Sequence, residues 1–519
     1  MSLARAAARA ARGALAADLW GRNSQAGLRC AQTALAADTL NERVLKAKYA
    51  VRGEIVTLAN KIQKDLDEGN GSYPFDKVLY CNIGNPHQLG QQPITFYRQV
   101  LTIMESPDMA DWPGVRDQVP SDVIARARRY LAGMRGMGAY TDSRGALVLR
   151  ESVARGIAER DGYDADPDDI FMTDGATAGV HMAMRLLLRD RSDSFLVPIP
   201  QYPLYSACIE LYNGTLAPYY LNETGGWRMD ARGLAEAVKT AREKGSNPRA
   251  IVVINPGNPT GNVLSYEDQR AIVDFCAREN LVLMADEVYQ ANIYSPDARW
   301  QSFKKVLRDM EADGSLGQGT PESPASPAMM SMMSTSKGFY GECGRRGGYV
   351  EVVGVSPEIK AEMYKLQSIS LCANTSGQVV MACVMDPPRP GEPSHAVYER
   401  ERSAILGSLA RRANMVADGL NKLEGVSCQV VEGALYAFPT ITLPPRAVEE
   451  AKKAGKTPEG FYCIELLKNT GVVAVPGDGF GQQEGTAHLR TTILPDERDI
   501  ATVLESMTAF HKAFMDKWR

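Results

Sequence analysis

The stretch STSKGFYGECGRRGG, residues 334–348, places one lysine among hydroxyl residues and glycines. Lys337 follows an apolar run, and Arg346 comes nine positions after it. A lysine amine forms a Schiff base with an aldehyde, and once released it can carry a proton as a general acid or base. Lys337 is therefore a candidate catalytic residue. The alternative interpretation is an ordinary surface lysine in a Ser/Gly loop.

Polar residues also stand at the ends of other apolar runs. Beside the amine of Lys337 they offer one carboxylate, several hydroxyls, an amide, an aromatic ring and an arginine. Such groups suit a planar, phosphorylated, nitrogen-containing ring that condenses with an amine. The segments are TDGATAG (173–179), PIPQYPLYS (198–206), NPGNPTG (255–261), ADEVY (285–289) and STSK (334–337).

The order of the expected elements explains how these segments can meet. Residues 250–254 form a short β-branched run, and residues 265–280 read as a helix with Ser265 as N-cap and Asp268 in a capping-box position. Residues 281–290 form a second apolar strand. Two strands without polar alternation, joined by a helix, predict an α/β fold with a parallel sheet covered on both faces. Ligands bind beyond the carboxyl ends of such strands.

Length and composition set the broad class. A chain of 519 residues with 44% hydrophobic residues is long enough for two domains or more. The net charge of −4, without a basic stripe after the first thirty positions, argues against nucleic acid as a partner. The five histidines have no metal-ligand spacing, so we expect no metal site. No apolar run approaches the length of a membrane span, so we expect a soluble protein. The nine scattered cysteines favour a reducing compartment.

The first residues differ from the rest of the chain. Residues 1–35 are rich in alanine and arginine and carry few acids, which is typical of an organelle transit peptide and leader. A mitochondrial (matrix) location is favoured over a plastid one because arginine outweighs serine and threonine. An alanine-rich helix of the fold is the other interpretation.

Several motifs in their order resemble a known family. STSKGFYGECGRRGG following NPGNPTG and DEVY is similar to the fold type I pyridoxal-phosphate aminotransferases. CNIGNPHQLGQQPITFYRQV, YTDSRG and LRTTILP resemble the alanine aminotransferase branch. The resemblance runs from about residue 45 to the end. It implies a large domain with a mostly parallel sheet flanked by helices, and a smaller α+β domain from the N- and C-terminal parts.

The resemblance also implies domain boundaries. Residues 40–135 would form an N-terminal arm and part of the small domain, residues 136–395 the large cofactor-binding domain, and residues 396–519 the C-terminal small domain.

The resemblance implies pyridoxal 5′-phosphate as the cofactor, bound as a Schiff base on Lys337. Asp286 would face the pyridine nitrogen and make the ring an electron sink. Tyr289 and Asn258 would hydrogen-bond the phenolic oxygen, and Tyr202 would stack on the ring. The plainer interpretations are a helix-capping aspartate and a core tyrosine.

The phosphate requires hydrogen-bond donors, and a helix N-terminus supplies them. Ala176 and Thr177 open an expected helix, and Ser334 completes the set. The family more often has a serine in this turn. Arg346 and Arg345 compete as the phosphate arginine, and the family spacing favours Arg346, with Arg345 as a solvated neighbour.

Two further residues come from the resemblance. Tyr140 is similar to the tyrosine that reaches the phosphate of the neighbouring subunit, which implies a homodimer with shared active sites. Arg490 resembles the residue that binds the substrate α-carboxylate through a planar guanidinium. A strand arginine paired with a nearby aspartate is the alternative.

The resemblance implies an aminotransferase that exchanges amino groups among L-alanine, 2-oxoglutarate, pyruvate and L-glutamate. Three alternatives stay open. A glutamate:glyoxylate aminotransferase is the nearest, although the C-terminus MDKWR is not a peroxisomal Ser-Lys-Leu signal. A pyridoxal-phosphate lyase of the same fold is the second. A non-enzymic regulator is the third, and it would require a DNA-binding segment that the first forty residues are too short to supply.

Overall fold

The computed structural model describes residues 39–49, 53–316 and 325–519. The predicted leader, residues 1–35, lies outside these ranges. The chain forms two compact units, residues 1–46 and 47–519. The described part of the first unit contains the short helix α2 (Glu42–Lys46). The second unit carries the sheets and all the predicted site residues.

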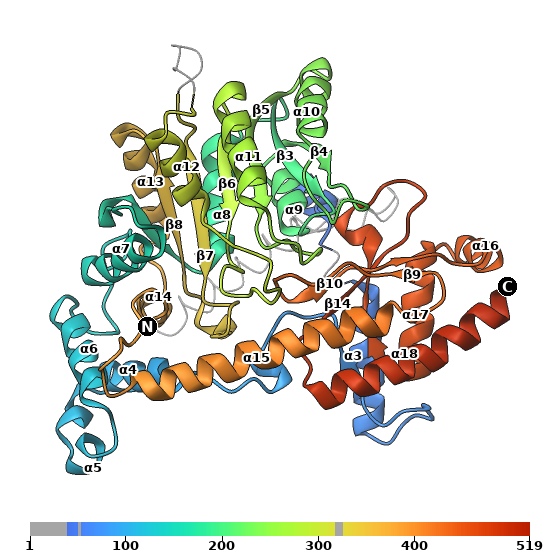
Figure 1. Cartoon of the computed structure of the whole chain (residues 1–519), viewed down its shortest axis with the longest axis horizontal. Coiled ribbons are helices and arrows are strands. Elements are labelled where there is room, and N and C mark those ends of the chain that lie inside the picture. The colour runs from blue at the N-terminus through green and yellow to red at the C-terminus, as the bar shows by residue number, and fades with distance from the viewer. Residues whose placement is uncertain (1–38, 50–52, 317–324) are drawn as a thin grey trace, which may run out of the picture. The chain divides into compact units, whose positions relative to one another are not determined.

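A seven-stranded sheet forms the centre of the second unit (Figure 1). Its strand order is β2-β8-β7-β6-β5-β3-β4. Neighbouring strands from β4 to β7 run parallel, and β8 is antiparallel to both β7 and β2. The sheet is therefore mostly parallel, as expected. The strands are β2 (Ile170–Thr173), β3 (Asp193–Ile199), β4 (Thr215–Tyr220), β5 (Asn247–Ile254), β6 (Val282–Asp286), β7 (Met329–Ser334) and β8 (Gly348–Val353).

Helices cover both faces of this sheet, which is why its strands are apolar without alternation. Strands β3, β7 and β8 are buried along their whole length. One face packs against α10, α11 and α12, and the other packs against α8, α9 and α13. These helices are α8 (Ala176–Leu187), α9 (Leu204–Leu211), α10 (Ala231–Glu243), α11 (Tyr266–Glu279), α12 (Phe303–Ala312) and α13 (Pro357–Ile369).

The predicted strand–helix–strand unit is present as β5, α11 and β6, and its helix start is confirmed. The Ser265 hydroxyl accepts a hydrogen bond from the Asp268 backbone N–H at 3.1 Å. The Asp268 carboxylate in turn accepts from the Ser265 N–H at 3.4 Å. This capping box satisfies two backbone donors that the first helical turn leaves free.

A second group of helices packs at the β2 and β8 edge of the sheet. Helices α4, α6, α7 and α14 share one apolar cluster with Ile170, Met333 and Tyr349. The helices of this region are α4 (Thr95–Glu105), α5 (Pro113–Arg116), α6 (Ser121–Ala132), α7 (Leu147–Asp161) and α14 (Thr375–Met385).

The smaller α+β part joins both ends of the described chain. Strand β1 pairs in parallel with β12, and β10, β14 and β13 form a three-stranded antiparallel sheet. Strands β9 and β11 pair beside it. The strands are β1 (Leu79–Tyr80), β9 (Val426–Ser427), β10 (Tyr436–Ala437), β11 (Thr440–Ile441), β12 (Val472–Val473), β13 (Val475–Pro476) and β14 (Leu489–Thr492). The helices are α3 (Glu54–Asp67), α15 (His395–Leu420), α16 (Pro445–Lys453), α17 (Pro458–Thr470) and α18 (Glu497–Trp518).

Helix α15 connects the two parts (Figure 1). Tyr398 near its start belongs to the cluster around α4, and its later residues Leu409, Ala413, Val416, Ala417 and Leu420 belong to the core of the smaller part. Boundaries at residues 135 and 395 stay a proposal. Within the described ranges, no helix combines the length and the apolar character that a membrane span requires.

Candidate active site

A cavity of about 960 Å³ opens where the carboxyl ends of β5, β6 and β7 meet the start of α8. This is the edge at which a parallel sheet binds ligands. Every site residue predicted from the sequence lines this cavity, apart from Tyr140. The predicted residues in the lining are Ala176, Thr177, Tyr202, Asn258, Asp286, Tyr289, Ser334, Lys337, Arg346 and Arg490.

Asp286 ends β6 at the floor of the cavity and is only 5% exposed. Its carboxylate accepts a hydrogen bond from the Tyr205 hydroxyl at 2.7 Å. Burial raises the pKa of Asp286, although Tyr205 and the nearby Lys337 partly oppose this shift. Among the described residues, no lysine, arginine or histidine forms an ion pair with it. A buried carboxylate of this kind is available to a cation that enters the cavity.

The sequence analysis did not single out Tyr205. It lies three residues after Tyr202 in the segment QYPLY, and this helical spacing at the start of α9 was the available signal. Sequence reasoning also missed a contact of Tyr202, whose hydroxyl lies 2.8 Å from the Tyr49 hydroxyl.

Lys337 projects toward the chain near β1. Its Nζ donates to the Gly84 carbonyl at 3.2 Å and lies 5.6 Å from the centre of the Tyr289 ring. A Cβ atom on Gly84 would lie 2.1 Å from the Tyr436 hydroxyl and 3.0 Å from Lys337 Nζ. Only glycine leaves this space open beside the amine.

Tyr436 of β10 is another residue that sequence reasoning missed. Its ring lies 6.2 Å from that of Tyr289, at 81°. Burial acts to raise the pKa of Tyr436, but the positive charges of Lys337 and Arg490 outweigh it and the pKa is lowered. Tyr436 lies in the apolar stretch LYAF, and no neighbouring polar residue singles it out.

The expected phosphate end lies at the start of α8. Arg346 Nη2 donates to the Asp174 carbonyl at 3.2 Å, and its Nη1 donates to the Ser336 hydroxyl at 3.3 Å. A Cβ atom on Gly175 would lie 2.6 Å from Arg346 Nη2, so a larger residue would displace the guanidinium. Arg345 instead lies 3.9 Å from the Glu342 carboxylate. The geometry therefore brings Arg346 to the cavity.

Arg490 is a buried cation, with 1% of its surface exposed. Its guanidinium lies between the rings of Tyr436 and Phe480, at 4.1 and 4.6 Å from their centres. It donates to the Asn258 side-chain oxygen at 3.2 Å and to the Asn82 carbonyl at 2.8 Å. Its Nε has no hydrogen-bond partner, and no carboxylate pairs with it in the described part of the chain. The alternative interpretation, in which Arg490 forms a structural ion pair with a nearby aspartate, is therefore wrong for the described residues.

Asn258 links two of the predicted roles. Its side-chain nitrogen donates to the Tyr289 hydroxyl at 3.4 Å, while its oxygen accepts from Arg490. One amide therefore contacts both the Tyr289 hydroxyl and the Arg490 guanidinium.

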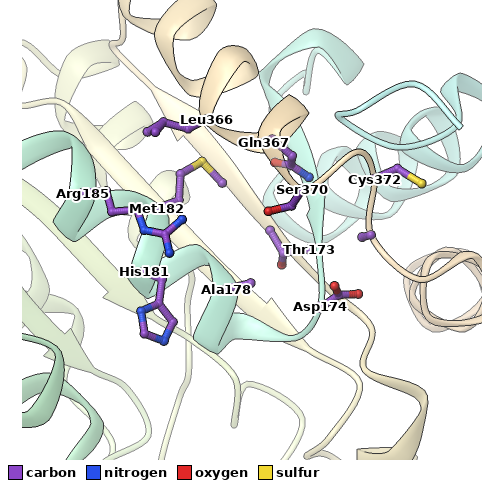
Figure 2. A pocket seen from close by; sticks show the side chains of 11 residues that line it. Thr173, Asp174, Ala178, His181, Met182, Arg185, Leu366, Gln367, Ser370 and Cys372 are labelled. Carbon is purple, nitrogen blue, oxygen red and sulfur yellow. The ribbon is translucent and has the colours of Figure 1, made fainter. Parts of the chain in front are cut away.

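Tyr140 does not line this cavity and is 76% exposed. A second cavity of about 240 Å³ lies between α8 and the end of α13, and Figure 2 shows the residues that line it. Its wall includes the exposed Ser370 and Thr173, whose buried hydroxyl has no hydrogen-bond partner among the described residues. Ile369 and Leu371 beside it are 76% and 51% exposed.

Comparison with known proteins adds to this geometry. Residues 112–507 match the family model of aminotransferase class I and II. This chain belongs to the class I and II aminotransferases. Alanine aminotransferase 1, mitochondrial, of Arabidopsis thaliana is 50% identical to this aminotransferase, over 93% of this chain and 87% of that protein. Glutamate–glyoxylate aminotransferase 1 of the same plant is 47% identical, over 93% and 97%.

Solved structures show the same fold. An alanine aminotransferase from Pyrococcus furiosus superposes with a TM-score of 0.69 at 24% identity, covering 91% of this aminotransferase and all of that chain. An aminotransferase from Escherichia coli gives the same TM-score and identity, covering 92% and 98%. At this identity the likeness concerns the fold.

The cost of burying Asp286 can be measured in the protein stripped of small molecules. Asp286→Asn keeps an acceptor for Tyr205 and removes the charge, so we expect the free energy of unfolding to rise by about 1 to 3 kcal/mol. Because the native pKa is raised, the gain should widen as the pH rises from about 4, the unfolded value of an aspartate, through the native value. Urea unfolding at several pH values measures it.

Asp161 provides the matched control. It is also buried but accepts from Arg160 at 2.7 Å, so Asp161→Asn should destabilise the protein. An equal loss of unfolding free energy in both variants would contradict the assignment of Asp286 as an uncompensated charge.

Proposed function

We propose that this aminotransferase moves the amino group of L-alanine to 2-oxoglutarate, giving pyruvate and L-glutamate, with pyridoxal 5′-phosphate as its cofactor. The observation that carries the proposal is the buried guanidinium of Arg490, which has a free Nε–H and lines the same cavity as Lys337 and Asp286. Every amino or keto acid brings an α-carboxylate, and a planar guanidinium binds it with two hydrogen bonds.

The residues of the cavity fit the cofactor. Asp286 is an uncompensated carboxylate where a protonated pyridine nitrogen would be stabilised, and Gly84 and Gly175 keep space clear beside Lys337 and Arg346. When bound, pyridoxal phosphate supplies an electron sink for negative charge at the substrate α-carbon. Lys337 would hold it covalently, and Tyr289 with Asn258 would bind its phenolic oxygen.

The phosphate group would bind at the other end of the cavity. Arg346 and Ser334 offer side-chain donors, and Ala176 and Thr177 offer the free N–H groups of the first turn of α8. The guanidinium of Arg346 is already held by Asp174 and Ser336, so it is fixed before an anion arrives.

The amine of Lys337 carries the proton transfer. Its Nζ takes a proton from the substrate α-carbon as a general base and later returns one as a general acid. Arg490 fixes the carboxylate and hence the direction of the α-carbon–hydrogen bond. Tyr205 keeps Asp286 in place while charge develops.

A glutamate:glyoxylate aminotransferase is the second candidate. The observation in its favour is the 47% identity to a plant protein of that name, close to the 50% for a named alanine aminotransferase. Both reactions would use the same Lys337, Asp286 and Arg490.

The choice of substrates can be tested directly. Purified protein given pyridoxal phosphate is offered pairs of amino and keto acids, and transfer of the amino group is measured. We expect the highest kcat/KM with L-alanine and 2-oxoglutarate. Highest efficiency with glutamate and glyoxylate would instead assign the second candidate.

The same assay tests Lys337. We expect Lys337→Ala to lose the visible absorption of the covalent cofactor and to lower turnover by at least about a hundredfold. Lys305→Ala, which removes an amine paired with Asp309 on α12, is the control and should keep both properties. Full turnover by Lys337→Ala would refute the mechanism.

We propose a homodimer in which each subunit contributes to the site of the other. Tyr140 is far more exposed than is usual for a tyrosine, and Ile369 and Leu371 expose apolar surface beside the cavity of Figure 2. The Thr141 hydroxyl, next to Tyr140, accepts from the Gln378 side chain of α14. Gln378 also donates to the Ala373 carbonyl between α13 and α14, so these exposed residues lie in one region. A second copy covering this region would bring Tyr140 to the partner's phosphate end.

Mixed dimers test the shared site. Lys337→Ala and Tyr140→Phe subunits should each form weak enzymes, but a mixed dimer has one site with both native residues, so mixing should raise the activity. The control mixes Lys337→Ala with Arg490→Ala, whose residues line the cavity of one chain, and it should restore nothing. No gain in the first mixture would place Tyr140 outside the partner's site.

We propose a mitochondrial location. Several relatives are named mitochondrial, among them proteins of Arabidopsis thaliana and Dictyostelium discoideum at 50% and 48% identity. A reporter fused to residues 1–35 should enter mitochondria. A plastid or cytosolic reporter would overturn this assignment.

A further inference from the structure

A buried histidine on the strand of Arg490 carries a further inference. His488 precedes β14, lies two residues before Arg490 and is only 2% exposed. Both of its ring nitrogens are engaged. Nε2 lies 3.1 Å from a Glu223 carboxylate oxygen, and Nδ1 lies 2.9 Å from the Gln482 side-chain oxygen.

The orientation of these groups is fixed by their neighbours. Gln482 donates its amide nitrogen to the Glu459 carboxylate at 2.7 Å, so its oxygen faces His488. Burial acts to raise the pKa of Glu223, but hydrogen bonds from His488 and Thr440 outweigh it and lower the pKa. An ionised Glu223 only accepts hydrogen bonds, so His488 Nε2 carries the donated hydrogen.

Glu223 belongs to the other part of the molecule. It lies in the turn after β4, at the edge of the seven-stranded sheet. The same carboxylate accepts from the Thr440 hydroxyl of β11. This carboxylate beside the large sheet therefore receives two donors from the smaller part, one from His488 just before β14 and one from Thr440 of β11.

An aromatic stack joins this contact to the guanidinium. The His488 ring stacks on Phe438 at 4.8 Å and an interplanar angle of 2°. Phe438 packs against Phe480 at 5.8 Å, and Phe480 lies 4.6 Å from the guanidinium carbon of Arg490. Trp227, from the same turn as Glu223, packs its ring edge against His488 at 5.7 Å.

The backbone at Gly477 packs closely against His488 and Gln482. A Cβ atom on Gly477 would lie 2.7 Å from the His488 Cβ and 2.8 Å from the Gln482 oxygen. Gly477 also donates its N–H to the His488 carbonyl at 2.8 Å. Gly477 therefore packs directly against the His488 Cβ and carbonyl, which couples a shift of His488 to the start of β14.

We propose that His488 is a positioning residue for substrate binding. Its hydrogen bond to Glu223 fixes β14 against the end of β4, so that Arg490 meets the substrate α-carboxylate at the correct angle. The inference rests on the proposed role of Arg490. A bidentate contact tolerates little displacement, so a shift of β14 weakens it without removing any group that touches the substrate.

The test uses the holoenzyme and two variants. His488→Phe keeps a stacking ring but removes the donor, and Glu223→Gln keeps the shape but removes the charge. We expect the KM for L-alanine and for 2-oxoglutarate, and the Kd of propionate, to rise about three- to thirty-fold. The absorption of the bound cofactor should stay unchanged, and kcat should fall less than KM rises. Propionate reports on the carboxylate contact alone because it has no amino group.

The double variant, with both His488→Phe and Glu223→Gln, and a control histidine provide two further tests. If the two residues act through one hydrogen bond, the double variant should be no weaker in binding than the weaker single variant. His511 is also 2% exposed, and its nitrogens contact Tyr462 and the Glu424 carbonyl on the far side of the small part. His511→Phe should lower stability but leave the Kd of propionate unchanged.

Each outcome decides something different. An unchanged Kd of propionate in both His488→Phe and Glu223→Gln overturns the positioning role, and so do fully additive effects. If His488→Phe does not fold, Glu223→Gln alone carries the test. Arg490→Lys serves as the reference for the proposed function. If that variant binds propionate normally, the carboxylate role of Arg490 itself fails, whatever the result for His488.

Discussion

The carboxylate of Asp286 is the constraint around which the site is arranged. Burying a charge without a counterion is unfavourable, and among the described residues only the Tyr205 hydroxyl and the Val288 N–H donate hydrogen bonds to this carboxylate. Asp286 ends β6, which pairs in parallel with both β5 and β7 in a sheet that helices cover on both faces. A ligand with a positively charged nitrogen removes this electrostatic cost. The unfavourable burial of the Asp286 charge in the empty protein therefore adds to the free energy gained when such a ligand binds.

Arg490 presents the opposite charge by a different route. Its burial is offset by two aromatic faces and two carbonyl oxygens, none of which neutralises it. The two charges come from different sheets, Asp286 from the seven-stranded one and Arg490 from the three-stranded one. The relative position of the two charged groups therefore depends on the contacts between the two parts of the protein. The hydrogen bond between His488 and Glu223 is one of these contacts.

Local rules of sequence explain the correct predictions and the omissions. The Ser265 cap, the unalternating strands and the polar residues at strand ends each depend on a few neighbouring positions, so they could be read directly, and the fold followed. Tyr205 could have been found by helical spacing. Glu223 and His488 could not, because they are 265 positions apart and pair only after both sheets have formed. The catalytic and binding roles of the cavity residues stay predictions.

The pairing of Leu79 with Val472 has a consequence for biosynthesis. All strands of the seven-stranded sheet have been synthesised once Val353 is added, so that sheet can form while the C-terminal part of the chain is still being made. The smaller part cannot, because its first strand waits for a partner near the C-terminus. Arg490 and His488 are among the last residues synthesised. A nascent chain therefore acquires the carboxylate of Asp286 before the guanidinium of Arg490, and a stop codon between β8 and β14 yields a chain that contains Asp286 but lacks Arg490.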